Sequence, residues 1–460
     1  MCGIFGVHGH SDANHLAQLG LYSLQHRGQE SVGVVSIDTS GTARAIRSMG
    51  TLSETLAQEL AKVPPGITAV GHTRYSTSGT STIENAQPVL ARSKGGYITL
   101  AHNGNLINAA ELRMELEEAG SIFASNSDSE VIVHRLARSN AAKPADRLAE
   151  ALAGVEGAYS LIVAIGDTLL AARDPRGWRP LAMGKLGDAT VFASETCALD
   201  IIGATIVRDV EPGEIVAVSN EGVSSTHPMP RKELHRCVFE FVYFARPDSR
   251  VYGGSVDRAR RAMGRQLALE HPAPTAELVF SVPDSSNSAA LGFAEASGIP
   301  YELALIRNHY VGRTFIQPTQ AGRDAKVKVK YNPVREVLEG KSVVMVDDSI
   351  VRGTTTRGLV ALVRAAGARE VHMRVSSAPV TGPCYYGIDT PSREELIAAN
   401  NTTEEIAAHL GVDSLGYLSL DGMLHSAPDG PHGFCHACFS GDYPTAPPTD
   451  PDKLRFGCGC

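Results

Sequence analysis

The arrangement of apolar runs changes near residue 230, and this change constrains the fold more than any other feature of the sequence. Up to that point apolar runs pair across short turns, as 158–165 and 168–172 do around Gly166-Asp167. From about residue 238 short apolar runs alternate with helical segments, which is typical of a parallel sheet. We therefore expect an α+β domain with antiparallel sheets between helices, followed by an α/β domain with a parallel sheet. The expected extents are residues 2–235, residues 236–425 and a C-terminal extension over residues 426–460.

Composition and charge exclude several classes of protein. The 460 residues are 43% hydrophobic and 20% charged, which is ordinary for a soluble globular protein. A net charge of −8 argues against a general nucleic-acid binder. No apolar run approaches the ~18 residues that cross a bilayer, and the N-terminus lacks a signal-peptide pattern. Eight cysteines are too sparse for a disulfide scaffold, so we expect a cytoplasmic protein. From the net charge and the lack of a long apolar run, we expect that it binds neither nucleic acid nor membranes.

The segment 343–355 has the composition of a phosphate-binding site. An apolar run ends in two adjacent carboxylates, and hydroxyl-bearing residues and a glycine follow before a helix begins. Backbone N–H groups at a helix start bind phosphate, and paired carboxylates suit ribose hydroxyls and Mg²⁺. The alternative is an ordinary strand-to-helix connection with acidic capping residues. The candidate residues are Asp347, Asp348, Ser349, Arg352, Gly353, Thr354 and Thr355.

The chain begins Met1-Cys2, so removal of one methionine would leave a cysteine with a free α-amino group. Position 2 holds a small side chain, which methionine removal tolerates. The unperturbed pKa of an α-amino group is roughly 7.7–8.0, so this amine can act as a base near neutral pH. A nucleophile activated by its own N-terminal amine is suited to acyl transfer. The other interpretation is a buried cysteine that opens an apolar strand.

Arg74, Asn103, Gly104 and Asp128, taken separately, are typical of a surface ion pair, a turn and a helix cap. Together with Cys2 they resemble the N-terminal-nucleophile (class II) glutamine amidotransferases. The resemblance implies that Arg74 offers a planar bidentate cation for the α-carboxylate of glutamine, and that Asp128 offers an anion for its ammonium group. It also implies that Asn103 and Gly104 offer hydrogen-bond donors for a tetrahedral oxyanion.

The segment 343–355 resembles the phosphoribosylpyrophosphate motif of type I phosphoribosyltransferases. In that family an earlier loop holds the pyrophosphate, and residues 283–290 lie in the corresponding place after an apolar run. The basic stretch 326–330 is either the solvent face of a strand or a lid over the polyanionic substrate, with Lys330 as a contact. The resemblance implies three Mg²⁺ ligands: Ser285, Asp347 and Asp348.

A glutaminase half followed by a phosphoribosyltransferase half is similar to one family, the glutamine phosphoribosylpyrophosphate amidotransferases, over roughly residues 2 to 445. The resemblance implies that phosphoribosylpyrophosphate, glutamine and water become 5-phosphoribosylamine, glutamate and pyrophosphate, the committed step of purine synthesis. Cys2, freed by removal of Met1, would form a glutamyl thioester and release ammonia, which an internal channel would carry to the ribose C1. Feedback inhibition by purine nucleotides and assembly as a homotetramer are also implied.

Two alternatives use the same residues. Another class II amidotransferase, such as a sugar-phosphate aminotransferring synthase, would share the Cys2 site but does not need the Asp347-Asp348 loop. A non-catalytic regulator that senses phosphoribosylpyrophosphate and binds nucleic acid would share that loop. The net charge of −8 and the full set of glutaminase residues argue against such a regulator.

Four of the eight cysteines form a candidate metal site. Cys435 and Cys438 make a CxxC pair, which by itself fits zinc, an iron–sulfur cluster, redox chemistry or chance. Cys237 and Cys384 complete the positions at which one branch of the resembled family binds a [4Fe–4S] cluster, although four thiolates also suit zinc. Such a cluster would tie the C-terminal extension to the sheet domain. The other cysteines discussed are Cys197, expected in the core, and Cys458 and Cys460, which have no assigned role.

Overall fold

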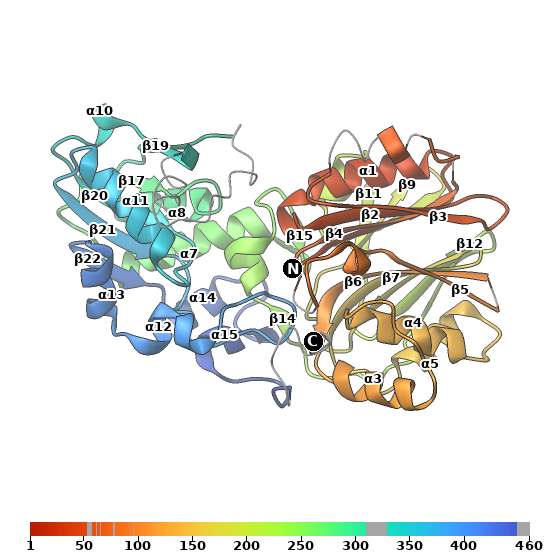
Figure 1. The fold of residues 1–460 in the computed structure, drawn as a ribbon. Helices are drawn as coiled ribbons and strands as arrows, with labels where there is room; N and C mark the ends of the chain where they lie inside the picture. Colours follow the sequence, from red (N-terminus) through yellow and green to blue (C-terminus); the bar gives the residue numbers. More distant parts are fainter. Residues whose placement is uncertain are drawn as a thin grey trace.

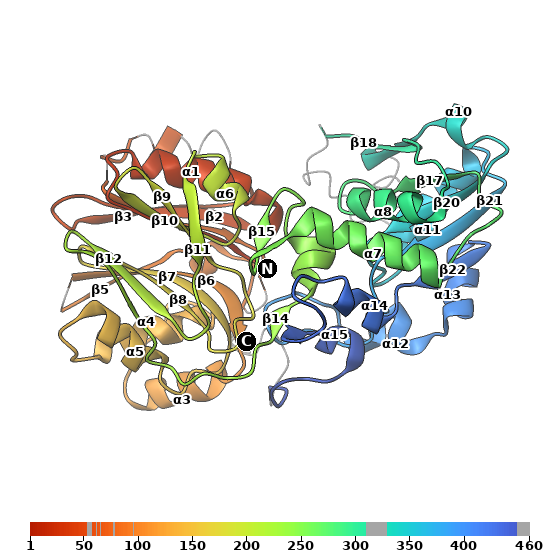
Figure 2. The ribbon, with the colours of Figure 1, turned by 180° about the vertical axis from the view of Figure 1, so that it is seen from behind.

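The chain folds into two lobes, and its N-terminus lies where they meet (Figure 1 and Figure 2). Among the described helices, none combines the length and the apolar character that a membrane crossing needs. Residues 326–328 of the basic stretch 326–330, and Cys458 and Cys460, lie outside the described residues. The computed structural model describes residues 1–52, 58–60, 62–64, 66–76, 79–94, 96–309 and 329–448.

Two sheets form the first lobe, and every strand pairing in them is antiparallel, as the sequence predicts. The predicted hairpin around Gly166-Asp167 is present as two adjacent strands of the second sheet. The seven-stranded sheet consists, in spatial order, of β11 (Thr205–Asp209), β9 (Ala182–Leu186), β10 (Ala189–Ala193), β1 (Gly3–His8), β4 (Thr68–Arg74), β2 (Ser31–Ile37) and β3 (Ala43–Met49). The six-stranded sheet consists of β13 (Gly222–Thr226), β12 (Ile215–Ser219), β8 (Thr168–Arg173), β7 (Gly157–Ile165), β6 (Gly96–Leu106) and β5 (Val89–Ser93).

The two sheets pack face to face, and helices cover their outer faces (Figure 1). Ile4 and Val35 of the first sheet share a buried apolar cluster with Ile162 and Leu169 of the second. Cys197 is buried in the cluster beneath the first helix, as expected for a core residue. The lobe is therefore the expected α+β arrangement of antiparallel sheets between helices. Its helices are α1 (Ala13–Ser23) and α6 (Cys197–Asp200) on one side and α3 (Ala109–Glu118), α4 (Ser129–Arg138) and α5 (Pro144–Leu152) on the other, with short turns η1 (Gln25–Arg27) and η2 (Ile83–Asn85).

The sequence Ser127-Asp128-Ser129-Glu130 predicts a capping box at the start of the helix through Val131 and Leu136. The start of α4 differs from this prediction. Asp128 occupies the N-cap position, but its side chain makes no capping hydrogen bond. The Glu130 carboxylate turns to the preceding loop and accepts from the N–H groups of Ala124 and Ser125, each at 2.8 Å. The capping prediction was therefore wrong, and the Asp128 carboxylate is available for another partner.

A four-stranded parallel sheet forms the centre of the second lobe, as the alternating pattern predicts. Alternate residues face two separate apolar clusters, for example Val344 on one face and Met345 on the other. The strands are, in spatial order, β17 (Leu278–Ser281), β20 (Ser342–Asp347), β21 (Glu370–Val375) and β22 (Ser414–Tyr417). The remaining elements around this sheet are β18 (Leu305–Arg307), β19 (Tyr331–Pro333), α10 (Arg335–Leu338), α11 (Thr354–Ala365), η4 (Arg393–Glu395), α12 (Ile397–Asn400), α13 (Thr403–Leu410) and α14 (Leu420–His425).

Helices α7 (Val256–Glu270) and α8 (Asn287–Ser297) cross closely because each places a glycine at the contact. A Cβ on Gly264 would lie 1.8 Å from the Ala289 carbonyl oxygen, and one on Gly292 would lie 2.1 Å from that of Arg261. Any larger side chain would force the helices apart, since packed interiors do not absorb such overlap. Helix α7 is therefore fixed directly against α8.

Residues 236–255, which we call the joining segment, connect the two lobes. Its first strand, β14 (Arg236–Cys237), pairs in parallel with β23 (Phe434–Cys435) of the C-terminal extension. A π-helical turn, η3 (Glu240–Phe244), follows. The extension therefore folds back onto the joining segment near the N-terminus (Figure 2). The remaining elements here are β15 (Arg250–Val251), β16 (Gly254–Ser255) and α15 (Ala437–Ser440).

Candidate functional sites

Cys2 lies buried at the start of β1, beside a strand of each sheet of the first lobe. Its neighbour Gly3 pairs with Thr73 of β4. The backbone N–H of Cys2 donates to Asn103 Oδ1 at 3.2 Å, and the sulfur lies 3.6 Å from the Tyr75 carbonyl oxygen. The structure thus places Cys2 beside Asn103, although 101 positions separate them in the sequence.

Asn103 and Gly104 lie on β6, and both have features of an oxyanion-binding pair. Asn103 is fully buried, and its Nδ2 has no hydrogen-bond partner among the described residues. A buried donor left unpaired costs about 1–3 kcal/mol, which an anionic oxygen would offset on binding. At Gly104 a Cβ would lie 1.9 Å from the Ala158 carbonyl oxygen, so only glycine fits. A substrate oxygen bound beside Cys2 can therefore find a donor already in place.

Arg74 and Asp128, the expected glutamine ligands, are both buried near this pair. Arg74 ends β4, and its Nη1 donates to the Thr80 carbonyl oxygen at 3.0 Å. Asp128 precedes α4, and its Oδ2 accepts from the N–H of Leu106, the last residue of β6, at 2.9 Å. The cation and the anion are thus fixed at the ends of β4 and β6, the strands that carry the neighbours of Cys2.

Arg27 also contacts Cys2, the candidate nucleophile, although it is not among the site residues expected from the sequence. Its Nε donates to the Cys2 carbonyl oxygen at 2.9 Å, and its two terminal nitrogens bind Glu240 at 3.0 and 2.7 Å. The same guanidinium donates to Glu195 at 2.5 Å. Burial opposes the charge on Arg27, but the two glutamates raise the pKa of its guanidinium above the ordinary value. No local pattern could have indicated this, because the partners lie 168 and 213 positions away.

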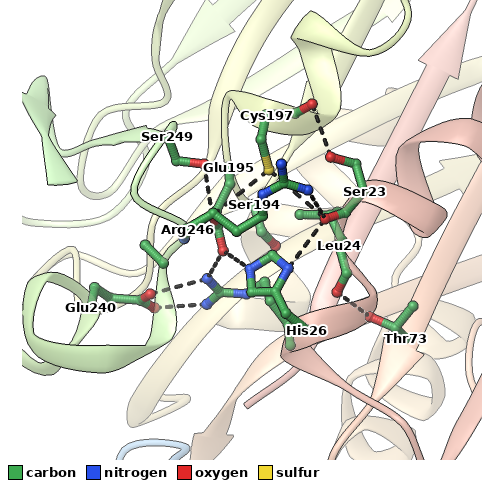
Figure 3. A network of polar contacts seen from close by, with 12 residues as sticks. Ser23, Leu24, His26, Thr73, Ser194, Glu195, Cys197, Glu240, Arg246 and Ser249 are labelled. Carbon is green, nitrogen blue, oxygen red and sulfur yellow. Dashed lines mark hydrogen bonds and ion pairs between the residues drawn. The ribbon is translucent and has the colours of Figure 1, made fainter. Parts of the chain in front are cut away.

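Glu195 forms the centre of a buried polar network at the lobe junction (Figure 3). Its carboxylate accepts from His26 Nε2 and Ser249 Oγ, both at 2.7 Å, and from the Arg246 N–H at 2.9 Å. Burial opposes ionisation, but His26 and Arg27 hold the pKa of Glu195 well below its usual range. The network therefore connects the first lobe to the joining segment through a charged carboxylate.

The two carboxylates of the candidate phosphate loop lie at the carboxyl end of the parallel sheet, beside the loop before α8. Asp347 ends β20, and its Oδ1 accepts from Ser286 Oγ at 3.1 Å. Asp348 accepts from Ser285 Oγ and, at 2.7 Å, from Ser349 Oγ. Burial and then Asp348 raise the pKa of Asp347, and burial raises the pKa of Asp348. Two adjacent buried carboxylates that repel each other form a suitable place for a divalent cation.

Helix α11 begins at Thr354, at the end of the loop that follows these carboxylates. Gly353 occupies its N-cap position with φ of +74°, a conformation that favours glycine. Thr354 and Thr355 follow in the first turn and are exposed. The first N–H groups of a helix have no partner within it, so this turn can bind a phosphate together with the two hydroxyls.

Arg352 and Lys330 are the least enclosed of the phosphate-site candidates. Arg352 is half exposed and forms an ion pair with Glu395 at 3.1 Å. The Lys330 ammonium lies 5.1 Å from the ring centroid of Tyr331 and is close enough to Asp347 to favour its charged form. Both cations therefore lie at the rim of the loop, where an incoming polyanion would meet them.

Four cysteines from three chain segments, Cys237, Cys384, Cys435 and Cys438, line one cavity together with Arg179. The parallel pair β14 and β23 places Cys237 opposite Cys435. Burial raises the pKa of Cys237 to about 11 and that of Cys435 to about 12. Among the described residues, no three His, Cys, Asp or Glu side chains are placed to share a single metal ion. Four thiols around one cavity fit a group that binds four cysteines.

The chain segment that carries Cys384 also packs on the strand that carries the candidate oxyanion donors. Asn105 Nδ2 donates to the Tyr385 carbonyl oxygen at 2.9 Å. A Cβ on Gly387 would lie 2.9 Å from the carbonyl carbon of Gly104. The cysteine cavity and the amide site are therefore only a few residues apart, a proximity that their separate motifs do not reveal.

Comparisons with known proteins agree with both halves of this arrangement. The family model of the glutamine amidotransferase domain matches residues 72–200. An amidophosphoribosyltransferase of Bacillus subtilis (strain 168) is 49% identical over 450 residues, which cover 96% of this chain and 94% of that protein. Chloroplastic amidophosphoribosyltransferase 2 of Arabidopsis thaliana is 48% identical over 457 residues, which cover 99% of this chain and 81% of that protein.

Solved structures give the same result for the fold. The glutamine phosphoribosylpyrophosphate amidotransferase from B. subtilis, complexed with ADP and GMP, superposes with a TM-score of 0.92 at 47% identity and covers 98% of this chain and 99% of its own. A structure described as the allosteric regulatory enzyme of purine biosynthesis gives a TM-score of 0.93 at 47% identity and covers 99% of both chains. The chain therefore belongs to the amidophosphoribosyltransferases, class II glutamine amidotransferases of purine biosynthesis.

Proposed function

We propose that Cys2 is the glutaminase nucleophile, acting after removal of Met1. Its thiol, deprotonated by the freed α-amine, attacks the glutamine amide carbon and forms a thioester as ammonia leaves with the transferred proton. Water then hydrolyses the thioester and releases glutamate. The unpaired Nδ2 of Asn103 carries this proposal, because it is a buried donor beside Cys2, and the Gly104 N–H supplies a second donor to the oxyanion.

Arg74 and Asp128 hold the two charged ends of glutamine in this proposal. The Arg74 guanidinium binds the α-carboxylate, and the Asp128 carboxylate binds the α-ammonium group. Both side chains are buried and each is anchored by a backbone contact, at 3.0 and 2.9 Å. Such fixed partners orient the amide toward Cys2 without a cost in side-chain freedom on binding.

The second site transfers the ammonia to phosphoribosylpyrophosphate. Asp347, Asp348 and Ser285 would hold Mg²⁺, which when bound offsets the charge of the departing pyrophosphate. Ammonia forms a bond to the ribose C1 as the bond from C1 to pyrophosphate breaks, and it loses a proton to give 5-phosphoribosylamine. An internal channel between the two sites would keep the ammonia from water. The groups proposed to bind the substrate phosphates and ribose are Asp347, Asp348, Ser349, Arg352, Gly353, Thr354, Thr355 and Lys330.

The cavity lined by Cys237, Cys384, Cys435 and Cys438 is proposed to hold a [4Fe–4S] cluster. The donor set fits, since a [4Fe–4S] cluster takes four cysteine ligands. The cluster would covalently join the joining segment, the Cys384 segment and the C-terminal extension, which is a structural role.

The chain's partners and organisation are proposed from the same family. Its domains would span 2–235, 236–425 and 426–460, and four copies would assemble in the cytoplasm. The B. subtilis structure is complexed with ADP and GMP, which supports purine nucleotides as feedback inhibitors of this chain. The proposal includes no nucleic-acid or membrane partner.

The two-site proposal predicts that one substitution at each site abolishes a different activity. Cys2→Ala should lower glutamine-dependent pyrophosphate release by more than about 10³-fold, because the nucleophile is absent, yet retain turnover with ammonia. Asp347→Asn should lose synthesis from either nitrogen source and still hydrolyse glutamine. Steady-state assays of pyrophosphate and glutamate measure both. Loss of ammonia-dependent turnover in folded Cys2→Ala protein would contradict the scheme.

Substitution of Asn103 tests the oxyanion role. Asn103→Ala should lower the kcat of glutamine hydrolysis by about 10²–10³-fold with little change in the KM for glutamine, because the donor acts on charge that develops in the transition state. Glutaminase kinetics give both constants. The control Asn108→Ala alters an exposed amide near Gly154 and should retain wild-type rates. A raised KM with unchanged kcat would assign Asn103 to ground-state binding instead.

The proposed [4Fe–4S] cluster predicts a defined content of iron and sulfide and a visible absorbance. Anaerobically purified protein should absorb broadly near 400 nm and contain about four irons and four sulfides per chain. Cys438→Ser should lose both signals, whereas Cys197→Ser should retain them, because Cys197 is buried in the other lobe. Elemental analysis and absorbance spectroscopy check this. One zinc per chain with no visible absorbance would refute the iron assignment.

A further inference from the structure

Trp178, the only tryptophan in the chain, forms part of the wall of the cysteine cavity. The residue is 2% exposed, and its Nε1 has no hydrogen-bond partner among the described residues. A buried indole N–H usually has a partner, because leaving such a donor unpaired is unfavourable. A sulfur atom bound in the cavity would supply the missing acceptor.

The indole is held in place on several sides. Its ring stacks on Tyr386, with the ring centroids 4.4 Å apart and the planes 15° from parallel. The Arg176 guanidinium lies 5.8 Å from the indole centroid. The Trp178 carbonyl oxygen accepts from the Tyr252 hydroxyl at 2.6 Å. Because these contacts fix both the ring and the backbone, the unpaired N–H stays beside the cavity.

Arg179 is the only cationic side chain among the described residues that line this cavity. It is fully buried, and its Nε and Nη2 both donate to the Tyr386 carbonyl oxygen, at 2.8 and 2.5 Å. Its Nη1 donates to Met1 Sδ at 2.7 Å and lies 3.8 Å from the Glu240 carboxylate. Removal of Met1, which the proposed function requires, takes the sulfur partner away. The processed chain thus keeps a buried positive charge at the cavity with one hydrogen bond fewer.

A cluster bound by four cysteines has the chemistry that these two side chains match. The charges of four thiolates outweigh the charge of the iron–sulfide core, so the bound cluster is an anion. Hydrogen bonds to its sulfur atoms, net charge and solvent exposure set its redox properties. The Tyr386 N–H already donates to Cys384 Sγ at 3.4 Å, so one N–H···S hydrogen bond is present at this cavity. An unpaired N–H and a buried cation in the same wall therefore fit an anion with sulfur acceptors.

We propose that Trp178 and Arg179 help to bind the [4Fe–4S] cluster from the first lobe, although neither is a ligand. The Trp178 Nε1–H donates a hydrogen bond to a sulfur atom of the cluster or of a cysteine ligand, and the Arg179 guanidinium offsets the negative charge. Both effects stabilise the electron-rich resting cluster against loss of an electron. The proposal rests on the proposed cluster site and adds two residues that protect the cluster from oxidants.

The first test uses the single tryptophan of the anaerobically purified full chain. The ultraviolet resonance Raman band that reports hydrogen bonding of an indole N–H comes from Trp178 alone. We expect the band of a hydrogen-bonded indole. Trp178→Phe retains an aromatic ring against Tyr386 but removes the donor. Its Fe–S stretching bands should move to higher frequency, because a hydrogen bond to sulfur draws electron density from the Fe–S bond.

The second test measures how fast the visible absorbance of the cluster is lost after addition of ferricyanide. Ferricyanide takes one electron and becomes ferrocyanide, and the oxidised core, [4Fe–4S]³⁺, then loses Fe²⁺ to leave [3Fe–4S]⁺. Trp178→Phe should bleach about two- to tenfold faster than the wild type, as expected for loss of one hydrogen bond. Arg179→Gln should bleach at least about tenfold faster, because a charged partner is lost. Arg179→Lys keeps the charge and should bleach more slowly than Arg179→Gln.

Arg176→Gln is the matched control, because Arg176 is a cation that contacts the indole but does not line the cavity. Its partly exposed charge is screened by water, so the variant should bleach within about twofold of the wild-type rate.

Each part of the proposal has a result that overturns it. The hydrogen bond is wrong if the indole band is that of an unbonded N–H, or if Trp178→Phe keeps the wild-type Fe–S bands. A purely structural role for Trp178 would lower thermal stability and leave those bands unchanged. The role of the Arg179 charge is wrong if Arg179→Gln bleaches at the wild-type rate, or if Arg179→Lys bleaches as fast as Arg179→Gln. Wild-type protein that carries zinc or no metal would instead reject the proposed cluster, and this inference with it.

Discussion

The buried ion pair between Arg27 and Glu240 is the interaction on which the arrangement of the two lobes depends. It is bidentate, and the same guanidinium also holds the carbonyl of Cys2 and the carboxylate of Glu195. Removing one partner of such a pair leaves an uncompensated buried charge, which typically costs 3–5 kcal/mol. Cys2 and the joining segment are therefore held by one guanidinium, which restricts their movement relative to each other.

Further hydrogen bonds between the lobes join the segment that carries Cys384 to the first lobe. Arg179 donates to the Tyr386 carbonyl oxygen at 2.8 Å, and Asn105 donates to that of Tyr385 at 2.9 Å. Both carbonyls follow Cys384 directly in the chain, so the cysteine cavity, the strand β6 that carries Asn103 and the N-terminus form one packed junction. An enzyme that passes ammonia between two sites needs such a junction, because relative motion of the lobes would open the path to water.

The sequence was sufficient to predict the two architectures and the candidate residues, but not the junction. Alternating apolar patterns and short turns are local, so they correctly predicted the antiparallel and parallel sheets. The Asp347-Asp348 motif and the penultimate cysteine could be found because each lies in a short segment. Arg27, Glu195 and Glu240 carry no local signal, since their partners are distant in sequence and only folding makes them a network. The capping box expected over Ser127-Asp128-Ser129-Glu130 failed because the Glu130 carboxylate binds the N–H groups of Ala124 and Ser125 in the preceding loop instead.

The central claim is that nitrogen passes from the Cys2 site to the phosphoribosyl site inside one molecule. The most direct measurement supplies the enzyme with phosphoribosylpyrophosphate, glutamine labelled with ¹⁵N in its amide, and excess unlabelled ammonium. The ¹⁵N content of the phosphoribosylamine is then measured by mass spectrometry. We expect product far richer in ¹⁵N than the ammonium in solution. Product with the same isotope ratio as the surrounding ammonium would show release into solvent and would contradict the account.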